Sequence, residues 1–356
     1  MKHRESMKIE EKARNELVAL LSAISAVKTI SIKSEPTSDG VVLDFLIELE
    51  HARKKYDLVC EVKSNGQPRH IRNALFQLNH FVRHFDNNAY PVIIAPYLSQ
   101  RSQDLCRADE CGYVDFVGNV HLAFGSIYID RKTDETPKNE QRSLRSMFKP
   151  KAANILRNLL NDPERRWRVA DLAEIANASV GHVSEVGQAL REREWAAQSK
   201  NGLYLTDPDG LLNAWSQEYE QPEGERVDLY THLHGSALIN AIEKLMANYP
   251  EPKIVFGSYT AADWLAPYAR TGKTYLYADE HGLGALQQHL ELQQPLKGPN
   301  IEICVPNEDG VLNDIERFSD HVICTSAVQT YLDLMNSGER GREAAEHLRK
   351  AKLQWQ

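Results

Sequence analysis

The stretch YDLVCEVKSNGQPRHIRNALFQL, residues 56–78, joins an apolar run to a segment of helical periodicity. The run 56–63 is typical of a buried strand and carries Glu61 and Lys63 two positions apart. Side chains at this spacing on a strand point to the same face, so the carboxylate and the ammonium group are expected side by side. The helix is predicted from the spacing of Ile71, Leu75, Leu78 and Val82.

Other polar residues near this strand have the chemistry of a divalent-metal site. Asp44, in the apolar run 41–50, is the first candidate to meet Glu61, and Asp57 on the Glu61 face is the second. Carboxylate oxygens are the ligands that Mg²⁺ prefers, and a bound metal activates water and neutralises a phosphate. Gln77 in the next helix and Glu16 in the first helix are expected to face the same cleft.

The series Asp44, Glu61-Val62-Lys63 and Gln77 resembles the PD-(D/E)XK nuclease superfamily over residues 9–131. The resemblance implies a mixed sheet flanked by helices. It also implies a catalytic set of Asp44, Glu61, Lys63, Gln77 and Glu16, active or vestigial, with Asp44 and Glu61 as the Mg²⁺ ligands. The alternative is that Glu61 and Lys63 belong to a solvated strand face.

Composition limits the class of protein. The chain has 356 residues and 42% hydrophobic residues, which suits two or three globular domains. No apolar run approaches the length of a membrane span, and a cytoplasmic protein is expected. The five cysteines form no Cys-x-x-Cys pair, so they support neither a zinc site nor a disulfide framework.

Two polar stretches divide the chain. Residues 132–146, with Pro137, are interpreted as a linker, and residues 217–228, with Pro222 and Gly224, as a second break. The predicted domains are therefore the nuclease-like residues 1–131, a middle domain 147–216, and an α+β domain 228–356. The net charge is −8, yet residues 136–168 hold nine basic and three acidic side chains. Such a basic island usually faces an anion.

The middle domain is predicted to contain three helices followed by two short strands around Lys200-Asn201-Gly202. In its third helix Val180, Val183, Val186 or Gly187, and Leu190 are expected to be buried. This order resembles the winged helix-turn-helix domains, whose third helix enters the major groove of DNA. The resemblance implies a reading face of Ser179, His182, Ser184, Gln188 and Arg191, with phosphate contacts from Arg165, Arg166, Lys151 and Lys200. The alternative is a winged helix used for protein contacts.

In the C-terminal domain, the Gly257-Ser258 turn is similar to the start of a nucleotidyltransferase motif. That chemistry also needs two spaced carboxylates on the following strand. The chain offers only Asp279 and Glu280, which are adjacent and would point to opposite faces. Transferase activity is therefore not expected.

The segments FGSYTAADWL (256–265), TSAVQTYLDLMNSGERGREAAEHLR (325–349) and APYLSQRSQDLCRADECGYVDFVGNVHLAF (95–124) resemble the AbiEi antitoxins of type IV toxin–antitoxin systems. The resemblance implies a phage-defence antitoxin that represses its own promoter by binding inverted repeats in double-stranded DNA, with no cofactor needed for DNA binding. It also implies a nucleotidyltransferase toxin as functional partner, without a stable complex. A homodimer is one assembly compatible with inverted repeats.

Taken together, the sequence predicts an α/β multidomain protein with a restriction-endonuclease-like sheet, a winged helix-turn-helix and an α+β domain. Three functions remain open. The first is an autorepressor and antitoxin, the second a Mg²⁺-dependent endonuclease targeted by its winged helix, and the third an interaction scaffold.

Overall fold

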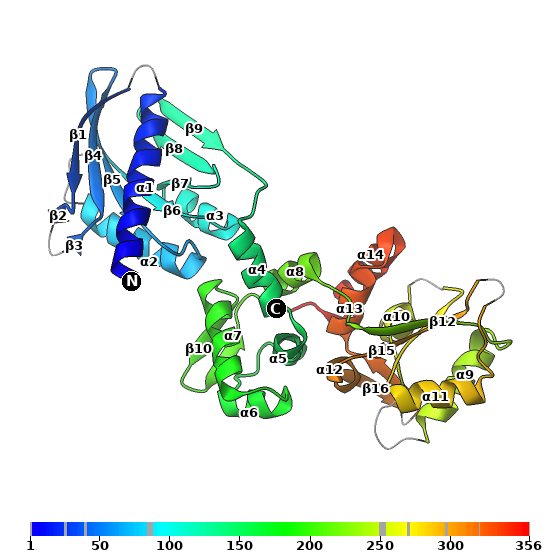
Figure 1. The fold of residues 1–356 in the computed structure, drawn as a ribbon. Coiled ribbons are helices and arrows are strands. Elements are labelled where there is room, and N and C mark those ends of the chain that lie inside the picture. Colours follow the sequence, from blue (N-terminus) through cyan, green and yellow to red (C-terminus); the bar gives the residue numbers. More distant parts are fainter. Residues whose placement is uncertain are drawn as a thin grey trace. The chain divides into compact units, whose positions relative to one another are not determined.

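The computed structural model describes residues 2–24, 27–38, 41–83, 88–248, 254–268, 271–295, 298–319 and 321–355. The chain forms two compact units (Figure 1). The first comprises Met1–Arg142 and Arg191–Glu194, and the second comprises Ser143–Leu190 and Trp195–Gln356.

The first unit is built on a seven-stranded mixed sheet of order β1-β4-β5-β6-β7-β8-β9. Strands β5, β6 and β7 are parallel to one another, whereas the other neighbouring pairs are antiparallel. The strands are β1 (Val27–Ser34), β4 (Phe45–His51), β5 (Lys54–Val62), β6 (Ala89–Ala95), β7 (Gly112–Asp115), β8 (Val120–Phe124) and β9 (Ile127–Arg131), and β2 (Thr37–Ser38) pairs with β3 (Val41–Val42).

Helices cover both faces of this sheet. α1 (Lys2–Ser22) packs on one face through Ala13, Leu17 and Leu21. α2 (Pro68–Val82) and α3 (Gln100–Ala108) pack on the other face. Successive side chains of β5 point to opposite faces of the sheet. Leu58 and Cys60 join the core under α1, and Val59 joins the core under α2 and α3, so both faces are apolar.

Two features of this unit differ from the expectation. The run 41–50 is not one strand, since β3 ends at Val42 and β4 begins at Phe45, so Asp44 lies in the break between them. The edge strand β1 was not predicted, because its side chains are mostly polar and none of those described is fully buried. The side chains of β1 whose burial is described are half-buried or exposed, so burial, which drives the apolar signal of a strand, is weak among them.

The second unit contains most of a segment of three helices and a hairpin, residues 150–205, called here the helix–hairpin segment; only its residues Arg191–Glu194 belong to the first unit. Its elements are α5 (Pro150–Asn161), α6 (Val169–Ile175), α7 (Val180–Glu192), β10 (Ala196–Ser199) and β11 (Gly202–Leu205). Trp167 bridges Leu203 beside the hairpin. Gly202 has φ of 135°, and a Cβ there would lie 2.3 Å from the Trp167 carbonyl oxygen, so glycine is needed at this turn.

A six-stranded sheet of order β12-β15-β14-β13-β17-β16 forms the rest of the unit (Figure 1). Its strands are β12 (Gly224–Leu229), β13 (Ile254–Phe256), β14 (Thr274–Ala278), β15 (Ile301–Pro306), β16 (Ile315–Ser319) and β17 (Val322–Thr325). The helices are α8 (Pro208–Glu218), α9 (Gly235–Met246), α10 (Ser258–Leu265), α11 (Glu280–His289), α12 (Gly310–Asn313), α13 (Ala327–Met335) and α14 (Gly338–Lys352). One continuous core runs from Met147 to Leu353, so the helix–hairpin segment and the sheet share their apolar interior.

The two polar stretches interpreted as a linker and a break contain regular structure. Residues Lys138–Met147 form α4, directly after Pro137, with only Met147 buried. Its less exposed positions, Glu140, Gln141, Leu144 and Met147, include only two apolar side chains, too few to give a helical signal in the sequence. Residues Gly224–Leu229 form β12, an edge strand paired with β15, and edge strands tolerate such polar side chains.

The large apolar side chains mostly occupy these cores. Among the residues with described placement, no helix is long and apolar enough to cross a membrane.

Candidate functional site

The end of β5 brings together three of the predicted catalytic residues. Lys63 Nζ donates to Glu61 Oε1 at 2.5 Å. The antiparallel register that pairs Phe45 with Cys60 places Asp44 opposite Glu61, and Asp44 Oδ2 accepts a hydrogen bond from the Val62 amide at 2.6 Å. A lysine and two carboxylates therefore gather at one point of the sheet, although Asp44 is held by a loop and not by a strand.

The pKa of Asp44 is raised from 3.8 to about 6. Burial of the carboxyl group is the largest cause, and the negative charge of Glu61 is the second. The hydrogen bond from Val62 and the charge of Lys63 act in the opposite direction. Raised carboxyl pKa values are typical of sites where carboxylates crowd together, and they are enriched at functional sites.

Gln77 and Glu16 do not join this cluster. Gln77 is exposed because it lies outside the apolar stripe of α2, whose buried positions include Ala74, Leu75 and Leu78. Glu16 is exposed as well, since it precedes the buried Leu17. Asp57 pairs in register with Glu48, four residues before Glu61 on β5, and is only half-buried.

Glu10 is the carboxylate of α1 whose charge reaches Asp44 and helps to raise its pKa. The sequence contains the signal for this residue. Glu10 precedes the buried Leu17 by seven positions, which is two helical turns, so both residues lie on the same side of α1. The spacing of the apolar residues in α1 therefore favours Glu10, and not Glu16, as the carboxylate of this helix that faces the sheet.

The cluster has one feature that suits a cation. Glu61 is 6% exposed, and its Oε2 is buried without a hydrogen-bond partner. An unpaired buried carboxylate oxygen is costly, and a divalent cation bound by Asp44 and Glu61 would satisfy it. The donor set is small, however, because the described part of the chain contains no group of three or more His, Cys, Asp or Glu side chains arranged to hold a metal.

The Asp44 carboxyl group is expected to titrate near pH 6 in the wild-type protein, and at a lower pH in Glu61→Gln. Removing a negative neighbour favours the ionised form of Asp44, so the shift is downward. Carbon-13 NMR of the side-chain carboxyl resonances measures it, with Glu48→Gln as the control. An Asp44 pKa that is the same in wild type and Glu61→Gln would contradict this arrangement.

The outward face of α7 carries the second predicted site. Ser179, Ser184 and Gln188 are exposed, and His182 and Arg191 are half-exposed. The Ser179 hydroxyl accepts a hydrogen bond from the His182 amide at 3.2 Å and so caps the helix, and the Ser184 hydroxyl donates to the Val180 carbonyl. Val183, Val186, Gly187 and Leu190 are buried as predicted, whereas Val180 is 56% exposed, because it lies in the first turn of α7, before the buried face begins at Val183.

Two arginines beside the hairpin are held by aromatic rings. The guanidinium carbon of Arg165 lies 3.7 Å from the centroid of the Trp167 ring, and that of Arg166 lies 4.1 Å from the Tyr204 ring. Both arginines are exposed, as are Lys151 and Lys200. Stacking restricts the side chain while leaving guanidinium N–H groups for an anion.

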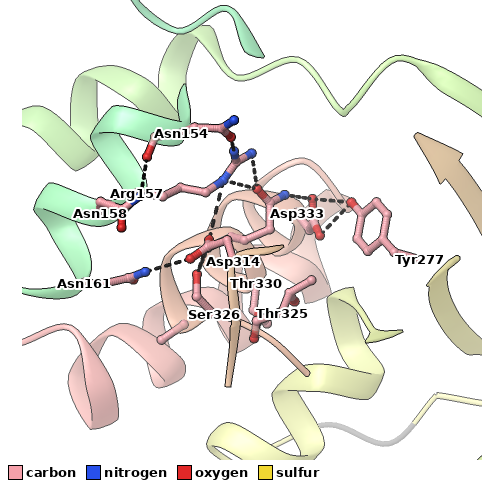
Figure 2. A network of polar contacts seen from close by, with 12 residues as sticks. Asn154, Arg157, Asn158, Asn161, Tyr277, Asp314, Thr325, Ser326, Thr330 and Asp333 are labelled. Atoms are coloured by element: carbon pink, nitrogen blue, oxygen red, sulfur yellow. Dashed lines mark hydrogen bonds and ion pairs between the residues drawn. The ribbon is translucent and has the colours of Figure 1, made fainter. Parts of the chain in front are cut away.

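One member of the basic island does not reach the surface. Arg157 on α5 is 5% exposed, and its Nε and Nη2 donate to Gln329 Oε1 at 2.9 and 2.7 Å. Its Nε also lies 3.5 Å from Asp314 Oδ2. Figure 2 shows Arg157 extending from α5 into a network that includes Asp314 and Asp333. Arg157 is therefore a structural residue, and counting charges along the sequence could not show this.

Comparison with known proteins connects the C-terminal part of the chain to a family. Residues 204–354, less than half of the 356-residue chain, match the family model described as "Transcriptional regulator, AbiEi antitoxin, Type IV TA system". The resemblance drawn from FGSYTAADWL and the 325–349 segment is confirmed for this part of the chain. The search of curated proteins gave no match.

Solved structures give weak similarities. A repair endonuclease from Pyrococcus abyssi is 14% identical with a TM-score of 0.24, and the match covers 30% of this chain and 46% of that one. EndoMS in complex with double-stranded DNA is 14% identical with a TM-score of 0.23, covering 29% of this chain and 42% of that one. The chain thus spans less than half the length of these proteins, and scores this low carry no conclusion about fold or function.

Proposed function

We propose that the protein is a DNA-binding transcriptional autorepressor and the antitoxin of a type IV toxin–antitoxin system that acts in phage defence. The observation that carries this proposal is the match of residues 204–354 to the AbiEi antitoxin and regulator family. The arrangement of the helix–hairpin segment supports it, and we assign this segment as a winged helix-turn-helix.

The surface of the helix–hairpin segment fits duplex DNA. Ser179, which precedes α7, and Ser184 and Gln188 on α7 are exposed, and their side chains can hydrogen-bond to base edges in the major groove. The stacked Arg165 and Arg166 have the chemistry of phosphate contacts, which position a protein without reading sequence. The exposed Val180 offers an apolar contact of the kind that meets a thymine methyl group.

In this function the target is the protein's own promoter, with inverted repeats bound by a homodimer. The functional partner is a nucleotidyltransferase toxin that the antitoxin opposes without a stable complex. In cells, this protein is expected to suppress the toxicity of the neighbouring gene product. On a sizing column, the two proteins are expected to elute separately. Stable co-elution would contradict this mode of neutralisation.

Gln188→Ala tests the reading face. The variant is expected to bind the promoter about tenfold more weakly and unrelated DNA as before, because a glutamine pairs with an adenine edge and contributes discrimination. Binding isotherms on promoter and scrambled duplexes measure this difference. Gln287→Ala, an exposed glutamine on α11, is the matched control. Equal weakening on both DNAs would show that Gln188 does not read sequence.

A metal-dependent endonuclease is the second candidate function. The orphaned Oε2 of Glu61 beside Asp44 and Lys63 is the observation in its favour. In that case Asp44 and Glu61 would hold Mg²⁺, which supplies Lewis-acid chemistry when bound. A metal readout independent of cleavage is the Asp44 carboxyl titration, since a bound cation would move its pKa downward.

A further inference from the structure

The second unit contains a polar pocket that the proposed function does not use. It lies over one face of strands β12, β15 and β14 and has a volume of about 350 Å³. The register produces two rows across these strands. Asp228, Glu302 and Tyr275 form one row, and Arg226, Cys304 and Tyr277 form the other. The alternate positions Leu276, Ile301 and Ile303 face the apolar core.

The face of β12, β15 and β14 that carries these two rows is polar, whereas a face packed into a core is normally apolar. Glu302 Oε2 accepts from Lys273 Nζ at 2.6 Å, and Lys273 also reaches Asp228 at 2.6 Å. Within the described residues, the hydroxyl groups of Ser258 and Tyr275 make no hydrogen bond, although both residues line the pocket. Polar groups that converge in a pocket, with donors and acceptors left over, are typical of ligand sites.

The backbone beside the pocket is strained. Ser258, the first residue of α10, has a φ of 48°. This is the left-handed region of backbone conformation, which residues other than glycine rarely adopt. Such strain persists only where the surrounding structure enforces it, and it concentrates at binding sites. The Gly257-Ser258 turn, which transferase chemistry does not explain, thus forms part of the pocket wall.

Asp333 forms the floor of the pocket and connects it to the helix–hairpin segment. Its carboxylate is 2% exposed and accepts hydrogen bonds from Tyr277 at 3.0 Å and from Gln329 Nε2 at 2.9 Å. The Oε1 of the same Gln329 side chain accepts from Arg157 on α5. Figure 2 shows this path from Tyr277 through Asp333 to Arg157. Asp333 and Arg157 therefore share the Gln329 side chain as a hydrogen-bond partner.

We propose that this pocket binds a nucleoside-type ligand and that its occupancy alters DNA binding through the Asp333–Gln329–Arg157 path. The Tyr275 ring, which packs against Tyr259 with centroids 5.6 Å apart, lines the pocket and offers a surface on which a planar base can stack. Carboxylates such as Glu302 suit ribose hydroxyl groups, as in dinucleotide sites. Arg226, which also lines the pocket, supplies a cation for a 5′-phosphate. The effect on DNA rests on the proposed function, whereas the binding of ligand does not.

Calorimetric titration of the full chain with adenosine, guanosine, cytidine, uridine and their 5′-monophosphates tests the pocket. At least one is expected to bind, with affinity at least about tenfold weaker in Tyr275→Ala and in Glu302→Gln, which remove a stacking face and a charged acceptor. Tyr268→Ala, an exposed tyrosine outside the pocket, is the matched control and is expected to bind as wild type. No binding at millimolar concentration, or binding unchanged in both pocket variants, overturns the site.

The effect of the ligand on DNA binding through the Asp333–Gln329–Arg157 path, called here the relay, is tested with the same ligand at saturation. Promoter affinity is expected to change by about fivefold or more, and DNA is expected to change ligand affinity by the same factor, because coupling is reciprocal. Gln329→Met, which removes the amide that bonds both Asp333 and Arg157 and does not line the pocket, is expected to retain ligand binding and reduce this change. Ligand binding with unchanged promoter affinity overturns the relay. A protein that binds ligand but no DNA refutes the proposed function and the relay, and leaves the site established.

Discussion

Arg157→Ala is expected to destabilise the second unit by about 3–5 kcal/mol, because removal of one partner leaves buried charge uncompensated. Burial raises the pKa of Asp314 and of Asp333, and the charge of Arg157, the cation that faces Asp314, opposes this rise. It also donates two hydrogen bonds to Gln329, whose Oε1 would lose both. Chemical denaturation followed by circular dichroism measures the loss.

Arg145→Ala is the matched control for this variant. Arg145 Nε lies 3.0 Å from Glu218 Oε2 in the same unit, but its side chain is 61% exposed. Exposed ion pairs contribute little to stability, so the control is expected to unfold almost as wild type. Comparable destabilisation by both substitutions would contradict the buried network as the reason for the Arg157 effect.

The loss in Arg157→Ala is also expected to be smaller at pH 5 than at pH 7. Burial raises the pKa of Asp333 from 3.8 to about 6, against the hydrogen bonds of Tyr219, Tyr277 and Gln329. A carboxyl group with a raised folded-state pKa contributes stability below its unfolded pKa and loses it as the pH rises through about 6. Without Arg157 the pKa of Asp333 rises further. At pH 5 the protonated Asp333 therefore carries no uncompensated buried charge, and the variant loses less stability. A pH-independent loss would contradict this reasoning.

The double variant Arg165→Ala/Arg166→Ala is expected to bind duplex DNA roughly a hundredfold more weakly, since each charged hydrogen bond contributes about a factor of ten. The weakening should be uniform across promoter and scrambled DNA, and the slope of log affinity against log salt should fall by about 2. Fluorescence anisotropy over a series of salt concentrations measures both quantities.

A matched double variant separates local contacts from the change in net charge. Arg340→Ala/Arg342→Ala removes two exposed arginines of α14 and changes the net charge equally. It is expected to bind DNA almost as wild type. If both double variants lose affinity to the same extent, the placement of the DNA surface at Arg165 and Arg166 is wrong.

The elements with strong periodicity were predictable from the sequence. α2, β5 and β6, the three helices of the helix–hairpin segment and the turn at Lys200-Asn201 all follow from apolar spacing and turn residues. The pairing of Glu61 with Lys63 follows from their spacing of two on a strand. These features depend on local rules, which a single sequence contains.

Other features depend on tertiary packing that the sequence does not express. Arg157 has the same local signature as its exposed basic neighbours, and only its partners Gln329 and Asp314, far along the chain, make it a buried residue. The edge strands β1 and β12 are polar and give no apolar signal. The pocket over β14 and β15 requires the register of three strands, which sequence reasoning did not supply.

The most direct measurement is to incubate the full chain with its own promoter DNA, with Mg²⁺ and separately with a chelator, and to follow binding and cleavage together. We predict a complex in both conditions that weakens steeply with salt, and intact DNA, with Glu61→Gln equal to wild type. Mg²⁺-dependent cutting that disappears in Glu61→Gln would contradict it and make the protein an endonuclease.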